Sequence, residues 1–176
     1  MKKLLLMHAL YTQQANTKVL DLLDKIAPEE RNKDRKSYYK SLTGLARHNI
    51  GSILFFHGLM RPALPDNKAL AATAELQMPD GESLDAGQWN QLKDVAGQAD
   101  QATVELLEGL SEEDLHKQLP IDWYGGNPAS VPLHYLLNIA TMHGVHHRGQ
   151  ISQILDEMGI DNDFSGIDVG FLSVMQ

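Results

Sequence analysis

The sequence predicts an all-α protein: a four-helix bundle with a long connection between the second and third helices and a small hairpin or turn before the last long helix. Four long segments repeat apolar residues at spacings of three and four, the period of one helix face. Pro28, Pro62 and Gly159 stand just beyond three of these segments. The length of 176 residues suits one core and is marginal for two, so we expect a single domain, residues 1–176.

The first helix is expected at the N-terminus and should end before Pro28. Its inward stripe is predicted to be Leu4, His8, Tyr11, Ala15, Val19, Leu22 and Ile26. The opening "MKKLLLMHAL" resembles a signal peptide, but its apolar run contains His8, continues with helical periodicity and lacks a convincing small-residue cleavage site. No apolar run approaches the ~20 residues that cross a bilayer. We therefore expect a cytoplasmic protein without a membrane partner.

The second helix is predicted to follow a solvated connection that contains "RNKDRK", residues 31–36. Ser37 is its expected N-cap and Pro62 its end. The inward stripe is predicted to be Leu45, His48, Ser52, Phe55 and Leu59. Glycine costs about 1 kcal/mol relative to alanine within a helix. Gly44 and Gly51 therefore indicate the close approach of another backbone.

A long connection is expected over residues 63–86, where prolines and Gly81 interrupt a weak periodicity. The third helix should begin at about Gly87. Its inward residues are predicted to be Trp89, Leu92, Ala96, Ala99, Thr103, Leu106 and Leu110. Ser111 and Asp114 form a capping signal for a short helix after it.

A turn or small hairpin is expected around Gly125-Gly126-Asn127-Pro128, because short apolar or aromatic runs flank this tetrapeptide. Pro132 suits the first position of the fourth long helix. The stripe of that helix is predicted to be Leu136, Ala140, His143, His147, Ile151 and Ile154, with Gly159 just beyond its end. The partly apolar tail that follows should pack against the bundle.

The composition excludes several classes of protein. A formal net charge of −8 argues against nucleic-acid binding, which needs a clustered basic face. The absence of cysteine excludes disulfides, thiolate ligands and a cysteine nucleophile. Any transition-metal site must therefore use His, Asp or Glu, and imidazole suits zinc, nickel, copper or iron.

Three of the eight histidines, His143, His146 and His147, fall within five residues. Residues i and i+4 lie one above the other on a helix, so His143 and His147 are a candidate pair of metal ligands. The glutamate that metalloproteases place between such histidines is absent. His146 is rotated by about 100° from His147 and is expected to face solvent, a neighbouring helix or a partner. Burying two unpaired imidazoles would be costly, which favours a shared metal or a polar cavity with carboxylates.

A third ligand must come from another helix. His48 and His8 both lie on inward stripes, and the pattern leaves both possible, since a lone inward histidine is more often a hydrogen-bonded core residue. The remaining histidines are expected to lie away from the site: His57, His116 and His134. A site with three histidines would keep an open position for water, as catalytic zinc sites do.

Other polar residues near the pair are candidates for support. Gln150, seven residues after His143, points almost the same way. It could donate a hydrogen bond to a ligand, contact the substrate, or be a polar neighbour in the bundle. Arg148 is predicted to seek a carboxylate, with Asp168 in the tail as a candidate partner. No Asp or Glu lies convincingly on the inward stripe beside the ligands, so no general base is predicted.

The segment "HGVHHRGQISQIL" resembles the signature of the DinB superfamily, the DinB/YfiT-like metalloenzymes. "SLTGLARHNIGSILFFHGL", with a histidine in the middle of a helix, resembles it too. "HALYTQQANTKVLDLL" and "NDFSGIDVGFL" resemble the opening helix and the usual ending of that family. The likeness spans nearly the whole chain, and "HHRGQ" is its most specific part.

The resemblance implies a four-helix bundle, often dimeric, that binds a divalent metal through three histidines. By motif position these are His48, His143 and His147. Two residues depart from the usual pattern, which has aromatic residues at these positions: Gln14, and Phe56 in place of tryptophan. Both concern packing or the pocket wall and not the ligands.

Characterised relatives include enzymes in which a metal activates the thiol of a small cofactor such as bacillithiol or mycothiol. The resemblance thus implies a metal-dependent S-transferase or metal-water hydrolase on a small molecule, with zinc or nickel favoured and iron or manganese as alternatives. Because the chain has no cysteine, the thiol must arrive as a co-substrate.

Two other functions fit the same sequence. One is a non-catalytic metal-binding protein, stress-inducible and dimeric, whose metal stabilises the bundle. The other is a dimeric interaction module in which the histidines matter little. Phe55, Phe56 and Leu59 widen the apolar face of the second helix and suit either core or a dimer seam, with core favoured.

Overall fold

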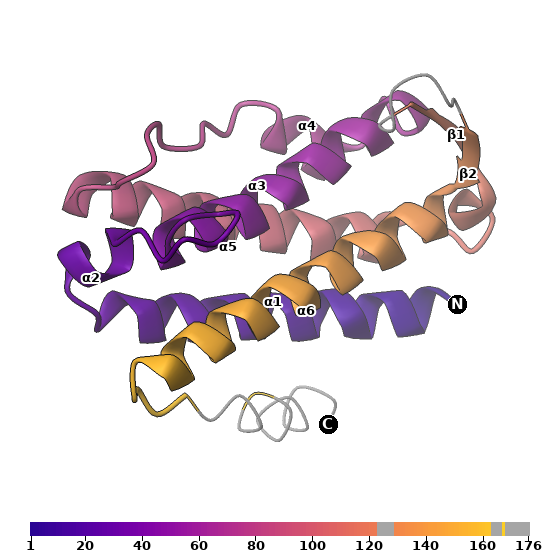
Figure 1. The fold of residues 1–176 in the computed structure, drawn as a ribbon. Coiled ribbons are helices and arrows are strands. Elements are labelled where there is room, and N and C mark those ends of the chain that lie inside the picture. Colours follow the sequence, from indigo (N-terminus) through magenta and orange to yellow (C-terminus); the bar gives the residue numbers. More distant parts are fainter. Residues whose placement is uncertain (123–128, 163–166, 168–176) are drawn as a thin grey trace.

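Four long helices form the body of the computed structural model (Figure 1): α1 (Lys2–Asp24), α3 (Leu42–Met60), α5 (Ala86–Gly109) and α6 (Leu133–Glu157). Shorter elements join them: α2 (Pro28–Asn32), the 3-10 turns η1 (Arg61–Ala63) and η2 (Asp114–His116), α4 (Lys68–Thr73), and the strands β1 (Gln118–Ile121) and β2 (Ala129–Pro132). The structure describes residues 1–122, 129–162 and 167. The predicted all-α helical bundle is confirmed.

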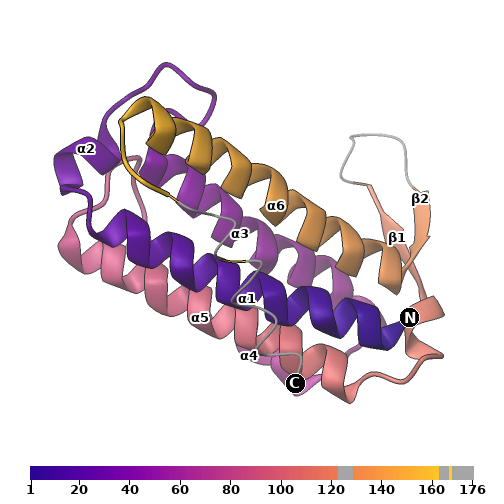
Figure 2. The same cartoon turned by 90° about the horizontal axis from the view of Figure 1, so that it is seen from below.

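Around the bundle the long helices follow the order α1, α5, α3, α6. Figures 1 and 2 show that α1 and α6 run in one direction and α3 and α5 in the other. Since α3 and α5 are parallel neighbours, the chain must return along the bundle between them, and residues 61–85 make this crossover.

The crossover is the predicted long connection, with one correction: it contains the helix α4, which packs against α5. Asn67 caps α4 by accepting a hydrogen bond from the Leu70 amide at 3.0 Å, and Leu70 and Thr73 are buried. A helix of 6 residues is too short to show a periodicity in the sequence.

The inward face of α1 is offset from the predicted stripe at its start. Leu4 is 52% exposed, whereas its neighbour Leu5 is buried. Further along, Ala15 and Val19 are buried as expected. Three consecutive leucines open this helix, and spacing alone could not choose among them.

The helix α3 begins later than predicted. Its N-cap is Ser41, whose Oγ accepts a hydrogen bond from the Gly44 amide at 3.0 Å, and not Ser37. Lys36 and Lys40 adopt positive φ values of 60° and 63°, which bend the loop before the cap and prevent an earlier helix start.

In the C-terminal half of α3, the buried face differs from the predicted inward stripe by one residue. Leu45 and Ser52 are buried as predicted, but Phe55 is 50% exposed and Phe56 is buried in its place. Leu59 is half-buried and packs at the edge of the core.

The predicted close approach of a backbone occurs at one of the two glycines of α3. A Cβ atom at Gly44 would lie 2.0 Å from the carbonyl oxygen of Tyr39, which no side chain could tolerate. At Gly51 an added Cβ would meet the terminal methyl of Met78 at 3.7 Å, an ordinary contact.

The helix α5 begins at Ala86, close to the predicted start. Asp85 caps it in a reciprocal pair of hydrogen bonds with Gln88. Most of the predicted inward stripe is buried: Trp89, Leu92, Ala96, Ala99, Leu106 and Leu110. The Ser111 and Asp114 signal closes a single 3-10 turn, shorter than the predicted helix.

The strands β1 and β2 pair antiparallel, with Leu119 opposite Val131, as predicted for a small hairpin. The expected turn residues 125–128 lie outside the described residues. Pro132 is the N-cap of α6 and not its first residue, a difference within the usual uncertainty of helix ends. In the tail, Ile167 is buried in the core, and Phe164, Val169, Phe171 and Leu172 lie outside the described residues.

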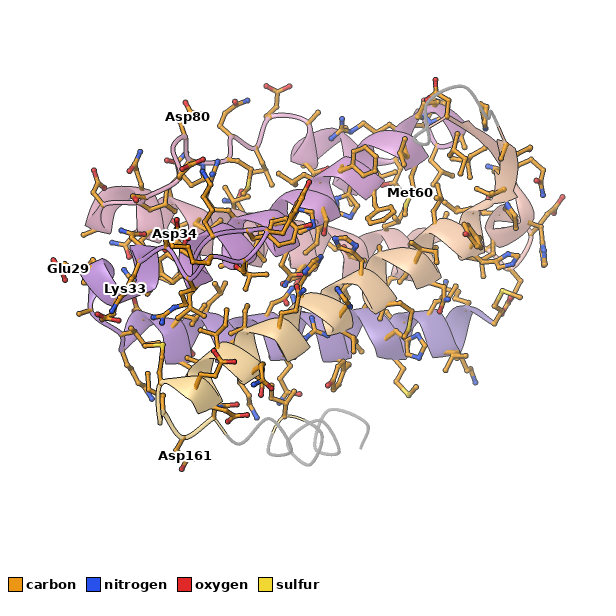
Figure 3. The ribbon with its side chains drawn as sticks, viewed as in Figure 1. Glu29, Lys33, Asp34, Met60, Asp80 and Asp161 are labelled. Atoms are coloured by element: carbon orange, nitrogen blue, oxygen red, sulfur yellow. The ribbon has the colours of Figure 1, made fainter. Side chains whose placement is uncertain are left out.

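Most charged side chains of the described residues lie at the periphery of the bundle. Figure 3 shows Glu29 and Asp34 near α2, Asp80 on the connection before α5, and Asp161 after α6. Met60, by contrast, is buried. Among the helices of the described residues, none has the length and apolar character needed to span a bilayer.

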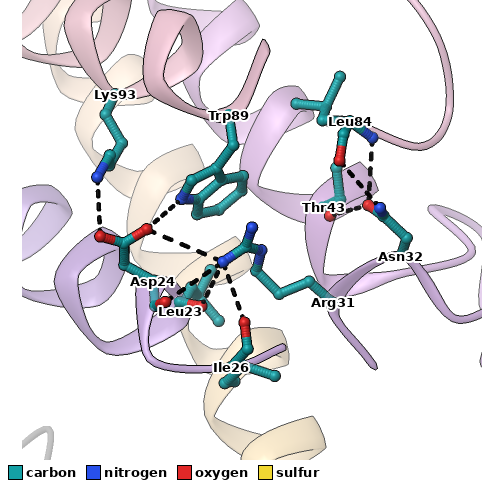
Figure 4. Close-up of polar contacts among 9 residues, drawn as sticks. All are labelled: Leu23, Asp24, Ile26, Arg31, Asn32, Thr43, Leu84, Trp89 and Lys93. Atoms are coloured by element: carbon teal, nitrogen blue, oxygen red, sulfur yellow. Dashed lines mark hydrogen bonds and ion pairs between the residues drawn. The ribbon is translucent and has the colours of Figure 1, made fainter. Parts of the chain in front are cut away.

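A buried arginine closes the C-terminal end of α1 (Figure 4). Arg31 Nη1 donates hydrogen bonds to the carbonyl oxygens of Leu23 and Ile26, both at 3.1 Å. Its guanidinium lies 4.1 Å from the centroid of the Trp89 ring, and Trp89 Nε1 donates to Asp24 at 2.8 Å. Carbonyl oxygens at a helix C-terminus lack their usual i+4 partners, and although that of Leu23 also accepts from the Ile26 amide at 3.1 Å, Arg31 supplies a further, charged donor.

The expectation that residues 31–36 are solvated is therefore wrong for Arg31. We expect Arg31→Met to lower the free energy of unfolding by about 2–3 kcal/mol, because buried carbonyl oxygens lose a charged donor. Lys33→Met, at an exposed position nearby, should change it by less than about 0.5 kcal/mol. Urea unfolding followed by circular dichroism measures both, and equal stability of the two variants would contradict this role of Arg31.

Candidate metal centre

Three histidines converge between the neighbouring helices α3 and α6. His48 comes from α3, and His143 and His147 come from successive turns of α6. One ring nitrogen of each can be chosen so that all three lie within 4.8 Å of one another, and such a group could hold a metal ion. In one pair, His48 Nε2 and His143 Nε2 are 2.9 Å apart.

The donor set suits a divalent cation. His147 Nδ1 lies 2.7 Å from Gln150 Oε1, a carbonyl oxygen that can only accept, so Nδ1 carries the hydrogen and Nε2 keeps its lone pair. Nitrogen ligands of tetrahedral zinc lie about 3.3 Å apart, given bonds of about 2.0–2.1 Å. His48 Nε2 and His143 Nε2, 2.9 Å apart, need to separate by only a few tenths of an ångström to meet that spacing.

Burial lowers the pKa of all three imidazoles. The effect is largest for His143, where burial and then the neighbouring His147 and His48 lower the pKa to about 4. Burial also lowers the pKa of His48 and of His147, although the hydrogen bond to Gln150 acts in the opposite direction at His147. The neutral imidazole is the form that binds metal. The lowered pKa values therefore favour the metal-binding form of all three rings at neutral pH.

Tyr39, which the sequence did not single out, forms part of the wall of this site. Its ring stacks on His48 with centroids 4.1 Å apart, and it meets His147 edge-on at 5.2 Å. Its hydroxyl oxygen lies 2.9 Å from His48 Nε2, and burial raises the pKa of the phenol. Tyr39 lies in an irregular loop, where no periodicity could mark it.

The histidines expected to lie away from the site, His57, His116 and His134, form no part of the three-histidine group. His57 is buried on another face of α3, with Nε2 2.9 Å from Thr103 Oγ1, and burial lowers its pKa to about 4. His146 is exposed. Among the described residues, His8 contributes no atom to the three-histidine group.

A buried polar quartet lies next to the three histidines, with one member from each long helix: Asn16, Asn49, Asp100 and Arg148. Asn16 Nδ2 donates to both carboxylate oxygens of Asp100, at 3.1 and 3.0 Å. Asn16 Oδ1 accepts from Arg148 Nη1 at 3.0 Å and from Asn49 Nδ2 at 3.3 Å. Asn49 follows His48 in the chain, and Arg148 follows His147. The hydrogen bonds of the quartet therefore link the two ligand-bearing helices to each other through Asn16, next to the ligands.

The sequence indicated no Asp or Glu convincingly on the inward stripe beside the ligands, but the structure shows Asp100 buried on the inward face of α5, as a member of the quartet. Burial raises its pKa to about 7, against the opposing effects of the Asn16 hydrogen bond and the charge of Arg148. Its position four residues after Ala96, on the inward stripe, was the signal that could have identified it. For Arg148 the structure shows Asn16 as a partner, and the predicted partner Asp168 lies outside the described residues.

Two grooves open beside His48. One, of about 420 Å³, is mainly apolar and is bounded by Phe55, Phe56, Ile139 and His143. The other, of about 380 Å³, is more polar and is lined by Tyr38, Tyr39, Lys40, Arg47, Met78 and Glu82. A small molecule in either groove would lie against the histidine group.

The fold and the site together are those of a helical-bundle protein with three histidines that could hold a metal ion beside two grooves. Comparison with protein families matches residues 1–164 to the DinB family. The chain belongs to the DinB family, which confirms the resemblance seen in its motifs. Comparison with curated proteins finds no match.

Proposed function

We propose that the protein is a divalent-metal-dependent enzyme that acts on a small molecule, with His48, His143 and His147 as the ligands. The observation that carries this proposal is the convergence of three imidazole nitrogens beside open grooves. A zinc or nickel ion, or iron or manganese, would activate the thiol of a co-substrate for transfer or a water molecule for hydrolysis.

The residues of the chain have distinct parts in this proposal. Gln150 holds the His147 ring in the tautomer that leaves Nε2 free for the metal. Because the hydrogen bond already fixes the orientation of the ring, metal binding costs less conformational entropy. Phe55 and Phe56 provide an apolar wall that would exclude water from a bound substrate. The chain has no cysteine, so in the transferase version the thiol comes from the co-substrate.

We also propose a single domain that forms a homodimer in the cytoplasm. Large apolar side chains are partly exposed on the two ligand-bearing helices: Phe55 on α3, and Met142 and Val145 on α6. A second copy of the chain would shield them from water.

A non-catalytic metal-binding role is the second candidate. It is favoured by the quartet, which joins the ligand-bearing helices to α1 and α5, so a metal held there would stabilise the whole bundle. Metal would then raise the melting temperature without turnover of small thiols, electrophiles or esters, whereas the enzyme would show both effects.

The first test is the metal content of untagged protein, measured by elemental analysis. We expect about one divalent ion per chain in the wild type. His48→Ala and His147→Ala should lose it, because each removes one of three ligands. His146→Ala, at an exposed neighbouring histidine, is the matched control and should keep it. Wild-type protein that binds no zinc, nickel, iron or manganese after reconstitution would refute the proposal.

A further inference from the structure

Tyr39 makes a contact that a metal in the histidine group would have to break. Its hydroxyl oxygen and His143 Nε2 each lie 2.9 Å from the same atom, His48 Nε2. A neutral imidazole nitrogen offers either one hydrogen or one lone pair. A cation bound to His48 Nε2 would take that lone pair, so the tyrosine hydroxyl would need a new partner.

The hydroxyl would stay close to the cation. With a metal–nitrogen bond of about 2.0–2.1 Å, a cation on His48 Nε2 lies no more than about 5 Å from the Tyr39 oxygen. The ring also contacts His147 edge-on, so Tyr39 touches two of the three proposed ligands. A group bound to the metal beside Tyr39 would be within hydrogen-bonding reach of the phenol.

The backbone around Tyr39 is built to hold it in this position. Its carbonyl oxygen lies where a Cβ of residue 44 would be, so only glycine at position 44 allows the loop to approach α3 this closely. The next residue, Lys40, has a positive φ of 63°, which is unusual for a non-glycine residue. The Ser41 amide then donates to the Tyr39 carbonyl oxygen at 2.7 Å.

We propose that Tyr39 is a ligand-binding residue of the metal centre: its hydroxyl donates a hydrogen bond to the group that occupies the open coordination position. This rests on the proposed metal site and adds the residue that selects its fourth ligand. A phenol donor beside the metal favours anionic oxygen, sulfur or nitrogen ligands, such as the thiolate of a co-substrate, because hydrogen bonds to charged groups are the strong ones.

The test compares wild type, Tyr39→Phe and Tyr135→Phe, all loaded with Co²⁺ and titrated with azide as the anionic probe while the visible spectrum is recorded. Tyr39→Phe keeps the stacked ring and loses only the hydroxyl. We expect it to bind Co²⁺ with wild-type stoichiometry but azide about tenfold more weakly. Tyr135, which is 41% exposed on α6 and lines neither groove, is the matched control, and its variant should behave as wild type.

Gly44→Ala provides a second variant, since the added methyl must displace the Tyr39 backbone. It too should weaken azide binding. Equal azide affinity in wild type and Tyr39→Phe would overturn the inference, as would loss of Co²⁺ from a folded Tyr39→Phe, which would make the phenol a metal ligand instead. With either outcome the wild type still binds metal, so the proposed metal site stands, whereas failure of the wild type to bind any metal would overturn both proposals.

Discussion

Replacing Asn16 by alanine should lower the free energy of unfolding by about 3 kcal/mol, the upper end of the cost of leaving buried polar groups without their hydrogen bonds. Asn16 supplies two hydrogen bonds to Asp100 and accepts one from Arg148, and all three side chains are buried. In the variant the buried Asp100 carboxyl and the buried Arg148 guanidinium keep their desolvation cost without these bonds. Urea unfolding followed by circular dichroism gives the size of the effect.

Gln13→Ala is the matched control on the same helix. Gln13 also makes a side-chain hydrogen bond to α5, at 3.0 Å to Gln101, but that bond is exposed. We expect this variant to stay within about 0.5 kcal/mol of the wild type. A loss of less than about 1 kcal/mol for Asn16→Ala would mean that the quartet is solvated or rearranged and does not hold the helices together.

The bundle was predictable because its long helices each bury one regular face. In α5, for example, Trp89, Leu92 and Ala96 recur at helical spacing and are all buried. The errors occurred where spacing carries no information. The stripe of α1 could begin at Leu4 or Leu5, and the start of α3 depends on the backbone angle of Lys40 before its cap.

The candidate site was predictable only in part, for a similar reason. His143 and His147 lie on the same side of α6 through local helix geometry alone, so their spacing identified them. The choice between His48 and His8 depends on how helices are aligned along one another, which no local pattern encodes. Tyr39 reaches His48 from an irregular loop, and Asp100 was overlooked among apolar neighbours of its stripe.

The quartet should also make stability depend on pH through Asp100. Burial raises the folded-state pKa of Asp100 to about 7, above the ordinary value of 3.8. The protonated carboxyl therefore stabilises the folded state at low pH, and this contribution is lost as pH rises through 7. Asp100→Asn has no proton to lose. We expect the free energy of unfolding of the wild type, relative to this variant, to fall by about 2–3 kcal/mol from pH 5 to pH 8.

Comparing the wild type with Asp100→Asn separates the pH dependence that comes from Asp100 from that of the histidines. Burial lowers the pKa of His57 to about 4, so folded protein resists protonation there and loses stability as pH falls from about 6.5 toward 4, opposite in sign to Asp100. His57 is unchanged in Asp100→Asn, so its contribution cancels in the difference. Urea unfolding of both proteins at the two pH values measures that difference. If it does not change with pH, Asp100 is ionised throughout, and the charge of Arg148 outweighs the cost of burying the carboxylate.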